Sequence, residues 1–432
     1  MATYDTAMPA SMTNHTSDPL CPKFKKLKEE EKLGGKGRPL LGSKDVGKRV
    51  VGGGKRVANF CAGPAAVSDQ VLLNLQHELL SYESSGMGLI EHSHRDVGGP
   101  VQTCMSNVCD LLREVLDIPD NYHVLLMQGG AHGQFAALPL NLLGSKKKAA
   151  YVDGGFWSHK AANEAKKYCE TVMIEPFTTN KDGKLVYPEP SQWKVDPEWA
   201  YIHICANETI NGLEFIKDPP VGTTDVPIVA DFTSTLMSRP VDVSKYGVIY
   251  ASGGKNLGPS GSVVVIVNDA LLGRELPICP GILSYSTAAT TKPIANLWYT
   301  PNVFAVRALN FVLSEVAHHG GLNVAKEKTS RKAYKVYKAI DLSDGFYVNN
   351  VADEYRSQVT IPFNIGAGKK NRPDLEKLFC EEAQRCNLHQ LAGHHTCGGL
   401  RVCIYNSVPD CAVDILMDFM ISFKKKYAHK YY

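Results

Sequence analysis

The apolar residues of this chain fall into short continuous runs, and segments with helical periodicity separate these runs from about residue 71 onward. A strand that is buried on both faces of a sheet has an unbroken run of Val and Ile instead of an alternating pattern. The pattern therefore predicts an α/β domain with a mainly parallel sheet. The runs that we expect to be strands are 123–127, 149–152, 200–204, 227–230, 247–251 and 262–267.

The last third of the chain has a different pattern. Apolar residues at helical spacing over 304–313 predict a helix that bridges two domains. Two apolar segments at 358–365 and 400–405, followed by a helix at about 412–426, predict a smaller α+β domain. Because 432 residues exceed what one hydrophobic core usually serves, we expect two domains. The expected division is a large domain at 57–310 and a small C-terminal domain at 311–432.

The first 56 residues differ from the rest in charge and composition. Residues 23–56 hold twelve Lys and Arg against four Asp and Glu, about +8, whereas the whole chain sums to +3. They contain too few large apolar side chains to offset the entropy of ordering. We therefore expect 1–56 to be a disordered basic extension, and we interpret it as a solvated appendage instead of a nucleic-acid or membrane contact.

Signals for targeting and for metal binding are missing from the sequence. The first twenty residues carry Asp5 and Asp18 but no Lys or Arg, and no apolar run approaches the length of a membrane span. We therefore expect a cytoplasmic protein without membrane contact. The twelve cysteines follow no paired-ligand spacing, so we expect no metal site and interpret Cys205, Cys380 and Cys403 as reduced thiols.

The strongest chemical signal is a lysine close to a carboxylate. Asp231 ends one apolar run, and Lys255 lies just past the next. A lysine amine can form a Schiff base with the aldehyde of pyridoxal 5'-phosphate (PLP), and a carboxylate can pair with the protonated pyridine nitrogen. The small residues Ser252, Gly253 and Gly254 let the backbone approach a flat cofactor. The pattern predicts a PLP site in which Lys255 also moves the substrate Cα proton.

A glycine-rich segment supplies the expected phosphate contact of this site. Gly129-Gly-Ala-His-Gly follows the first expected strand and precedes a helix candidate at 135–143. Ligands of parallel sheets bind beyond the carboxyl ends of the strands, and free amides at a helix start attract phosphate. We therefore expect the backbone amides of Ala131 and His132 to hold the PLP phosphate.

From about 57 to 432 the chain resembles the phosphoserine aminotransferases, which are class-V aminotransferases with PLP fold type I. The resemblance rests on motifs that occur in the family's order, and it implies a PLP-dependent transaminase with that fold. These motifs are Asn59-Phe-Cys-Ala-Gly-Pro-Ala-Ala, Gly86-Met-Gly-Leu-Ile-Glu-His-Ser-His-Arg, Gln128-Gly-Gly-Ala-His-Gly-Gln-Phe, Trp157-Ser-His-Lys-Ala-Ala, Asn207-Glu-Thr-Ile-Asn-Gly, Ser238-Arg-Pro-Val-Asp-Val-Ser-Lys-Tyr-Gly and Gly398-Gly-Leu-Arg-Val-Cys-Ile-Tyr-Asn.

The resemblance assigns cofactor roles to several residues. Trp157 matches the indole that stacks on the PLP ring, and Thr209 matches the hydroxyl that bonds the PLP phenolic oxygen. Thr300 matches a residue that reaches the PLP phosphate of the neighbouring subunit, so the resemblance implies a homodimer with shared active sites. We expect Asn207 and Asn256 to be structural.

The resemblance also assigns the substrate contacts. Arg401 matches the arginine that grips the substrate α-carboxylate, for which a planar two-pronged donor is well suited. His94 and Arg95 match the pair at the substrate-phosphate end of the site, where His394 also belongs. We expect Thr300 and His394 to act across the subunit interface.

The chain departs from the family pattern near the expected site. Gly253 and Gly254 stand where the family has Ala-Gln, which removes an amide side chain that bonds the PLP phosphate. We expect Gly254→Gln to tighten PLP retention. Tyr299 stands where the family donates an Asn across the dimer. His395 replaces a phosphate-binding arginine, and an imidazole is a weaker ligand for a phosphate dianion at neutral pH.

Three functions are compatible with these residues. The first is transamination between phosphoserine and 2-oxoglutarate in serine biosynthesis, with an anionic amino acid and a 2-oxo acid as the only partners besides the second subunit. The second is a divergent paralogue that uses PLP for transamination, or for β-elimination or replacement, on phosphoserine or another anionic amino acid. The third is a non-catalytic scaffold. The intact set of Lys255, Asp231, Trp157 and Arg401 argues against the third function.

Overall fold

The structure is a computed structural model that describes residues 56–174, 177–187, 190–218, 226–366 and 371–430. Except for Arg56, the basic extension expected at 1–56 lies outside the described residues, and its disorder stays a prediction.

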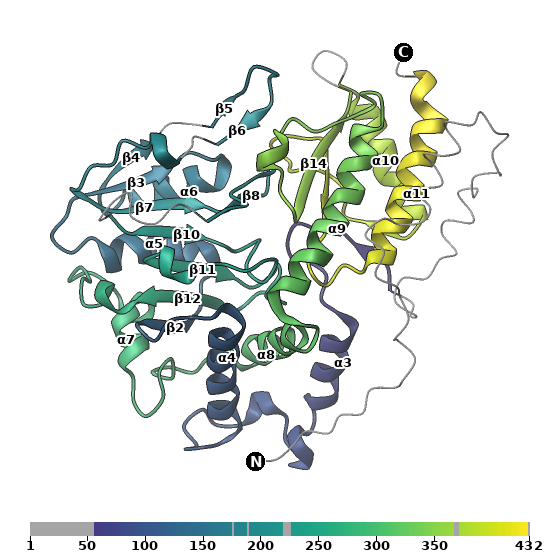
Figure 1. Cartoon of the computed structure of the whole chain (residues 1–432). Helices are drawn as coiled ribbons and strands as arrows, with labels where there is room; N and C mark the ends of the chain where they lie inside the picture. Colours follow the sequence, from purple (N-terminus) through teal and green to yellow (C-terminus); the bar gives the residue numbers. More distant parts are fainter. Residues whose placement is uncertain (1–55, 175–176, 188–189, 219–225, 367–370, 431–432) are drawn as a thin grey trace. The chain divides into compact units, whose positions relative to one another are not determined.

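The largest sheet within the described residues has seven strands (Figure 1). They are β2 (Tyr122–Met127), β3 (Lys148–Val152), β4 (Glu170–Ile174), β7 (Trp199–Cys205), β10 (Ile228–Asp231), β11 (Val248–Ser252) and β12 (Val263–Asn268). Their order across the sheet is β2-β12-β11-β10-β7-β3-β4. The strands from β11 to β4 run parallel to one another, whereas β12 runs antiparallel to both β11 and β2. This mixed, mainly parallel sheet confirms the expected large α/β layer.

Six of these strands are the six apolar runs of the sequence, and only β4 was missed. Helices cover both faces of the sheet, which explains why the six runs are continuous. Along β12, Val264 and Ile266 belong to one buried cluster, and Val263 and Val265 belong to another. The strand β4 lies at the edge of the sheet, and Glu170 and Met173 on it are exposed, so its sequence lacks the continuous apolar run.

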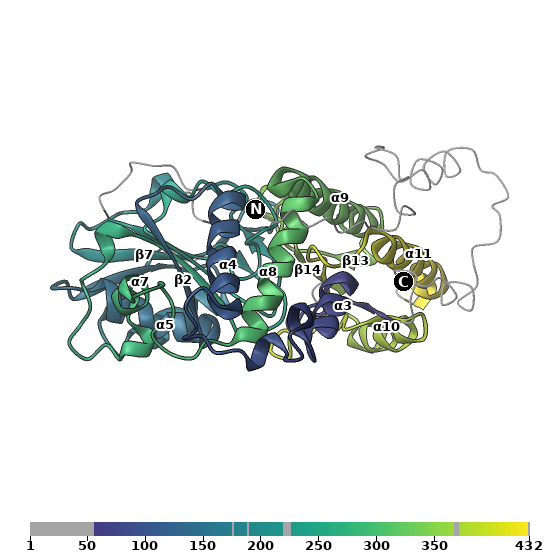
Figure 2. The ribbon, with the colours of Figure 1, turned by 90° about the horizontal axis from the view of Figure 1, so that it is seen from below.

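The two faces of the sheet carry different helices. One cluster includes residues of α4 (Pro100–Leu116) and α8 (Val303–His318), which lie side by side in Figure 2. The other includes residues of α5 (Gly130–Leu142), α6 (Phe156–Ala165) and α7 (Tyr285–Thr290). The helices α5 and α6 follow directly after β2 and β3, so each begins at the carboxyl end of a strand. This arrangement carries their first turns to the edge where a ligand of such a sheet binds.

The C-terminal part is built on a three-stranded antiparallel sheet of order β13-β14-β16. Its strands are β13 (Tyr347–Val348), β14 (Thr360–Ile365) and β16 (Leu400–Cys403), and its helices are α9 (Gly321–Asp341), α10 (Pro373–Arg385) and α11 (Asp410–Tyr427). The expected strands and the last helix are thus confirmed. The helix α8 packs against both α4 and α9, as expected of a bridging element. The expected domain boundary at 310 lies inside α8, and the division into two domains stays a prediction.

Shorter elements complete the described residues. The first is α3 (Asp69–Glu78), a helix whose N-cap is the Ser68 side chain. Short paired strands are β1 (Ala58–Asn59) with β15 (Leu388–His389), β5 (Thr178–Thr179) with β6 (Leu185–Val186), and β8 (Asn207–Glu208) with β9 (Leu213–Glu214). Over the described ranges, no helix is both long and apolar enough to cross a membrane. The described cysteines, Cys205, Cys380 and Cys403 among them, are free thiols.

Candidate active site

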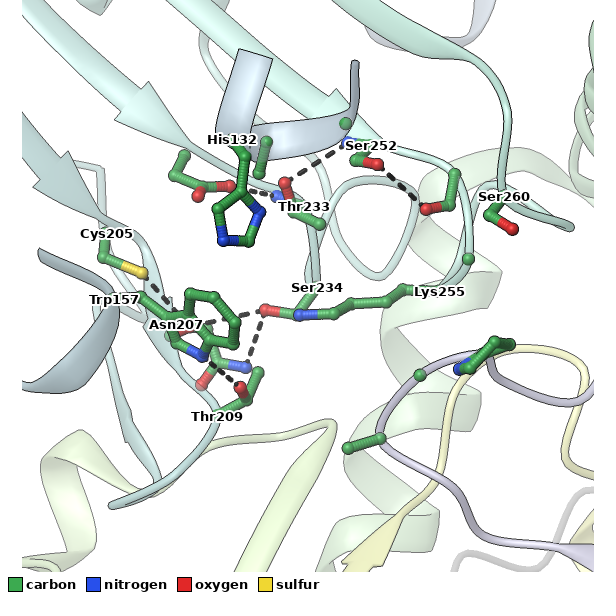
Figure 3. A pocket seen from close by; sticks show the side chains of 18 of the residues that line it. His132, Trp157, Cys205, Asn207, Thr209, Thr233, Ser234, Ser252, Lys255 and Ser260 are labelled. Carbon is green, nitrogen blue, oxygen red and sulfur yellow. Dashed lines mark hydrogen bonds between the residues drawn. The ribbon is translucent and has the colours of Figure 1, made fainter. Parts of the chain in front are cut away.

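A cavity of about 430 Å³ opens beyond the carboxyl ends of β7, β10 and β11, beside the first turn of α5 (Figure 3). Residues far apart in the sequence meet there because parallel strands end at the same edge of a sheet. The cavity is lined by nine of the residues that the sequence predicted for the site, which are Ala131, His132, Trp157, Thr209, Asp231, Gly254, Lys255, His394 and Arg401.

Lys255 and Asp231 both line this cavity. Asp231 is the last residue of β10 and is only 6% exposed. Its Oδ1 accepts a hydrogen bond of 2.8 Å from the Thr233 amide. Burial raises the pKa of Asp231, while the Thr233 hydrogen bonds and the attraction of Lys255 oppose that shift. Burial also lowers the pKa of Lys255, so its amine loses its proton more readily than an exposed lysine and can serve as a base.

Trp157 is held in place at the start of α6. Its indole Nε1 donates a hydrogen bond of 2.9 Å to Thr209 Oγ1, and its ring centroid lies 5.7 Å from Lys255 Nζ. The carboxylate of Glu208 accepts hydrogen bonds from the backbone amides of Trp157 at 3.1 Å and Ser158 at 2.7 Å. These contacts fix the indole beside the lysine and present a flat aromatic face to the cavity.

Glu208 was not among the site residues predicted from the sequence. Glu208 is fully buried, and it satisfies two free amides at the start of α6. The carboxylate in the middle of the Asn207-Glu-Thr motif could have indicated this role, because a buried carboxylate is rare unless it is paired. Asn207, expected to be structural, also lines the cavity, and its Nδ2 donates to Ser234 Oγ at 2.9 Å.

The first turn of α5 forms the side of the cavity suited to an anion. The amides at the start of a helix have no partner within the helix, and the helix dipole adds partial positive charge there. Ala131 and His132 lie in this turn. Burial lowers the pKa of His132, and the nearby Lys160 adds to that shift. The neutral imidazole can therefore accept from the Lys160 ammonium, whose Nζ lies 3.3 Å from His132 Nε2.

Arg401 and His394 line another part of the cavity, where Arg401 supplies a permanent positive charge. Arg401 lies on β16, and its Nη1 donates a hydrogen bond of 3.1 Å to the Thr209 carbonyl. Burial lowers the pKa of His394, and the charges of His395 and Arg401 add to the shift. The exposed ring of His395 lies beside that of His394, with 4.1 Å between the ring centroids. Within the described residues, Arg401 and His394 form no ion pair with a carboxylate, so this wall is suited to an anion.

The remaining predicted residues lie elsewhere in the chain. His94, Arg95, Tyr299 and Thr300 line a second cavity of about 420 Å³. His395 lines neither of these two cavities, and the structure separates the other sequence-predicted residues into two groups. His394, which we expected to act across a subunit interface with Thr300, belongs instead to the cavity of Lys255 in the same chain. The loop before β16 brings His394 to this cavity together with Arg401, and its expected role across the interface stays a prediction.

The backbone around Gly254 revises the expected effect of restoring a glutamine there. Gly254 has φ +97°, a conformation that L side chains rarely adopt. The neighbouring Gly253 has no room for a side chain, because a Cβ there would lie 2.4 Å from the Pro259 carbonyl oxygen. The Gly254 amide donates to the Gly258 carbonyl at 2.7 Å. This bond closes a turn that contains Lys255. The turn thus depends on the glycines at both positions.

We therefore expect Gly254→Gln to strain the protein and to leave PLP retention no tighter. The free energy of unfolding should fall by roughly 1–3 kcal/mol because the residue must adopt a positive φ. Urea unfolding of the apoprotein and PLP titration measure the two effects. Gly273→Gln is the matched control, since Gly273 also has a positive φ but lies outside the cavity. Tighter PLP binding by Gly254→Gln at unchanged stability would contradict this prediction.

The chemistry of the cavity fits PLP. The buried Asp231 carboxylate provides a partner for a protonated ring nitrogen, and Lys255 provides an amine for an aldehyde. The Trp157 indole provides a stacking face, and the first turn of α5 provides amides for a phosphate. Bound PLP would supply an electron sink for the substrate Cα. No group of three or more His, Cys, Asp or Glu side chains in the described part of the chain is arranged to hold a metal ion.

The fold and this cavity define a class of protein, and comparison with known families identifies it. Residues 57–416 match the family model for class-V aminotransferases, and the chain therefore belongs to that family, with the phosphoserine aminotransferases as its near relatives. The resemblance seen in the sequence and the fold type I class are both confirmed.

Two solved structures illustrate the similarity. The phosphoserine aminotransferase from Bacillus circulans subsp. alkalophilus is 35% identical with a TM-score of 0.79, over 86% of this chain and 99% of that one. The PLP-bound phosphoserine aminotransferase from Trichomonas vaginalis is 33% identical with a TM-score of 0.78, over 85% of this chain and 100% of that one. A ureidoglycine-glyoxylate aminotransferase from Bacillus subtilis, 14% identical with a TM-score of 0.65 over 88% of this chain and 95% of that one, shares the fold alone.

Proposed function

We propose that this protein is a PLP-dependent phosphoserine:2-oxoglutarate aminotransferase that acts in serine biosynthesis as a homodimer in the cytoplasm. The observation that carries the proposal is the part of the cavity wall that Arg401 and His394 form. Arg401 and His394 line the cavity and form no ion pair within the described residues. An unpaired arginine and a histidine donor in a concave site suit an anionic ligand. The family membership supports the reaction, and the named structural relatives support phosphoserine as the amino donor.

Each residue has a distinct part in this proposal. Arg401 holds the substrate α-carboxylate with the guanidinium nitrogens that do not bond Thr209. Lys255 would accept the proton of the substrate Cα at Nζ, and its lowered pKa favours the free amine that this transfer needs. Trp157, fixed by its hydrogen bond to Thr209, would stack on the cofactor ring and orient the substrate Cα toward Lys255.

The second cavity supports the dimeric part of the proposal. His94 and Arg95 line it and form no ion pair within the described residues, so they are available to an anion. Exposed apolar side chains accompany this cavity, with Val97 at 85% and Trp298 at 39% exposure. Exposed apolar groups of this kind are typical of an interface. We infer that a second copy of the chain covers them and that His94, Arg95, Tyr299 and Thr300 complete the site of the partner.

A substrate panel tests the proposed reaction. Purified holoenzyme is incubated with 2-oxoglutarate and one amino donor at a time: phosphoserine, serine, cysteate or cysteine. The products measured are glutamate, 3-phosphooxypyruvate and phosphate. We expect kcat/KM for phosphoserine to exceed that for serine by at least about tenfold, because charged hydrogen bonds to the phosphate are lost with serine. Release of phosphate without formation of glutamate would support β-elimination instead. Preference for cysteate would favour the divergent paralogue.

His395→Arg is expected to lower the KM for phosphoserine at pH ~7.5 by about tenfold, because it adds a permanent two-pronged cation beside His394. The wild-type KM should fall between pH 8 and about 6.5, since histidine charges as pH falls. The lowered pKa of His394 moves its own contribution below that range. Steady-state kinetics at each pH measure the effect, and the variant should have the flatter profile. Unchanged phosphoserine kinetics would argue against phosphoserine as the substrate.

A further inference from the structure

The loop after Lys255 folds back onto the cofactor side of the cavity. The Gly253 amide donates to the Ser262 carbonyl at 2.8 Å, and the Gly254 amide donates to the Gly258 carbonyl at 2.7 Å. These two bonds close the segment 253–262 into a compact turn. Ser260 lies within this turn and lines the same cavity as Lys255 (Figure 3).

Ser260 occupies the space toward which a side chain at 254 would point. A Cβ built on Gly254 would lie 3.5 Å from the Ser260 Cβ, which is ordinary van der Waals contact. The family pattern has at this position a glutamine that bonds the PLP phosphate. The chain therefore lacks the glutamine side chain at the same place in the cavity wall where the Ser260 side chain lies.

The Ser260 hydroxyl is available to a ligand. No other described residue forms a hydrogen bond with it, although it lines a cavity with many polar groups. The hydroxyl of Ser252, also in the wall, already donates to the Gly253 carbonyl at 3.0 Å. Ser252 approaches the first turn of α5, because a Cβ on Gly130 would lie 3.6 Å from Ser252 Oγ. Ser260 thus provides a free hydroxyl donor in the cavity wall that Ser252 and the first turn of α5 also form.

We propose that Ser260 donates a hydrogen bond to the phosphate of PLP and so takes over the part of the missing glutamine side chain. The proposal rests on the assignment of PLP to this cavity. A phosphate dianion at the start of α5 accepts from free amides there, and it has further lone pairs for a hydroxyl donor. A hydroxyl reaches the anion without a side chain at 254, where the backbone has φ +97°.

The test compares two ligands that differ only in the phosphate. The full-length apoprotein is titrated with PLP and with pyridoxal, and binding is followed by absorbance and by tryptophan fluorescence. Ser260→Ala should raise the dissociation constant for PLP by about tenfold or more, because a hydrogen bond to a charged group is lost. The dissociation constant for pyridoxal should change by less than about twofold. Ser260→Thr, which keeps the hydroxyl, should retain PLP affinity near that of the wild type.

Ser262→Ala is the matched control, because Ser262 belongs to the same turn but its hydroxyl is buried without a hydrogen-bond partner and does not line the cavity. Its PLP affinity should equal that of the wild type. An unchanged PLP affinity in Ser260→Ala, or an equal loss for PLP and pyridoxal, would overturn the proposal. A wild-type protein that binds no PLP would refute the cofactor assignment itself, whereas normal PLP binding by wild type and Ser260→Ala alike would refute only the role of Ser260.

Discussion

Replacing Lys255 with alanine is expected to abolish transamination and the visible absorption band of protein-bound PLP, while the protein remains folded. Among the described residues that line the cavity, Lys255 is the only lysine. The variant therefore loses both roles of its amine, the bond to the aldehyde and the transfer of the Cα proton. Loss of a nucleophile that is also the general base should reduce kcat by at least about 10⁴-fold. Turnover assays measure transamination, absorbance spectra measure the visible band, and borohydride reduction detects the covalent protein–PLP adduct.

A matched variant separates this loss from a change in the charge of the cavity. Lys160→Ala removes a lysine that contacts His132 but does not line the cavity. It should keep the visible band and the borohydride-reducible adduct. If Lys255→Ala also kept a reducible adduct and normal turnover, the assignment of Lys255 would be wrong.

Mixing two inactive variants is expected to restore activity if the two cavities complete each other across a dimer. One variant is Lys255→Ala, and the other carries Arg95→Ala with Thr300→Ala, which lie in the second cavity. A heterodimer then has one site with all of its residues intact. Random exchange of subunits makes about half of the dimers mixed, each with one active site of two, so about a quarter of the wild-type activity should return.

His394 provides the control that the structure makes possible. It lines the same cavity as Lys255, so mixing Lys255→Ala with an inactive His394→Ala variant should restore nothing. Rescue by the His394 variant, or none by the Arg95 and Thr300 variant, would exclude the proposed exchange between subunits. Sedimentation of the active protein as a monomer would exclude it as well.

Much of the fold could be predicted because its signals are local. The six continuous apolar runs became strands of one sheet, since helices bury both of its faces. The edge strand β4 escaped because its exposed residues interrupt the apolar pattern. Lys255 and Asp231 could be placed near each other for a related reason. Each lies at or just beyond the carboxyl end of a parallel strand, and β10 and β11 are neighbours.

The sequence alone determined the classes of its segments, the family and the residues capable of the chemistry, because these depend on local order and residue type. The tertiary structure decided which of them meet. Arg401 reaches the Thr209 carbonyl from 192 positions away, and no local pattern encodes such a contact. His394 joined the cavity of Lys255, whereas Thr300 did not. The positive φ of Gly254 likewise follows from closure of a turn, because backbone angles in a loop are set by the contacts between its ends.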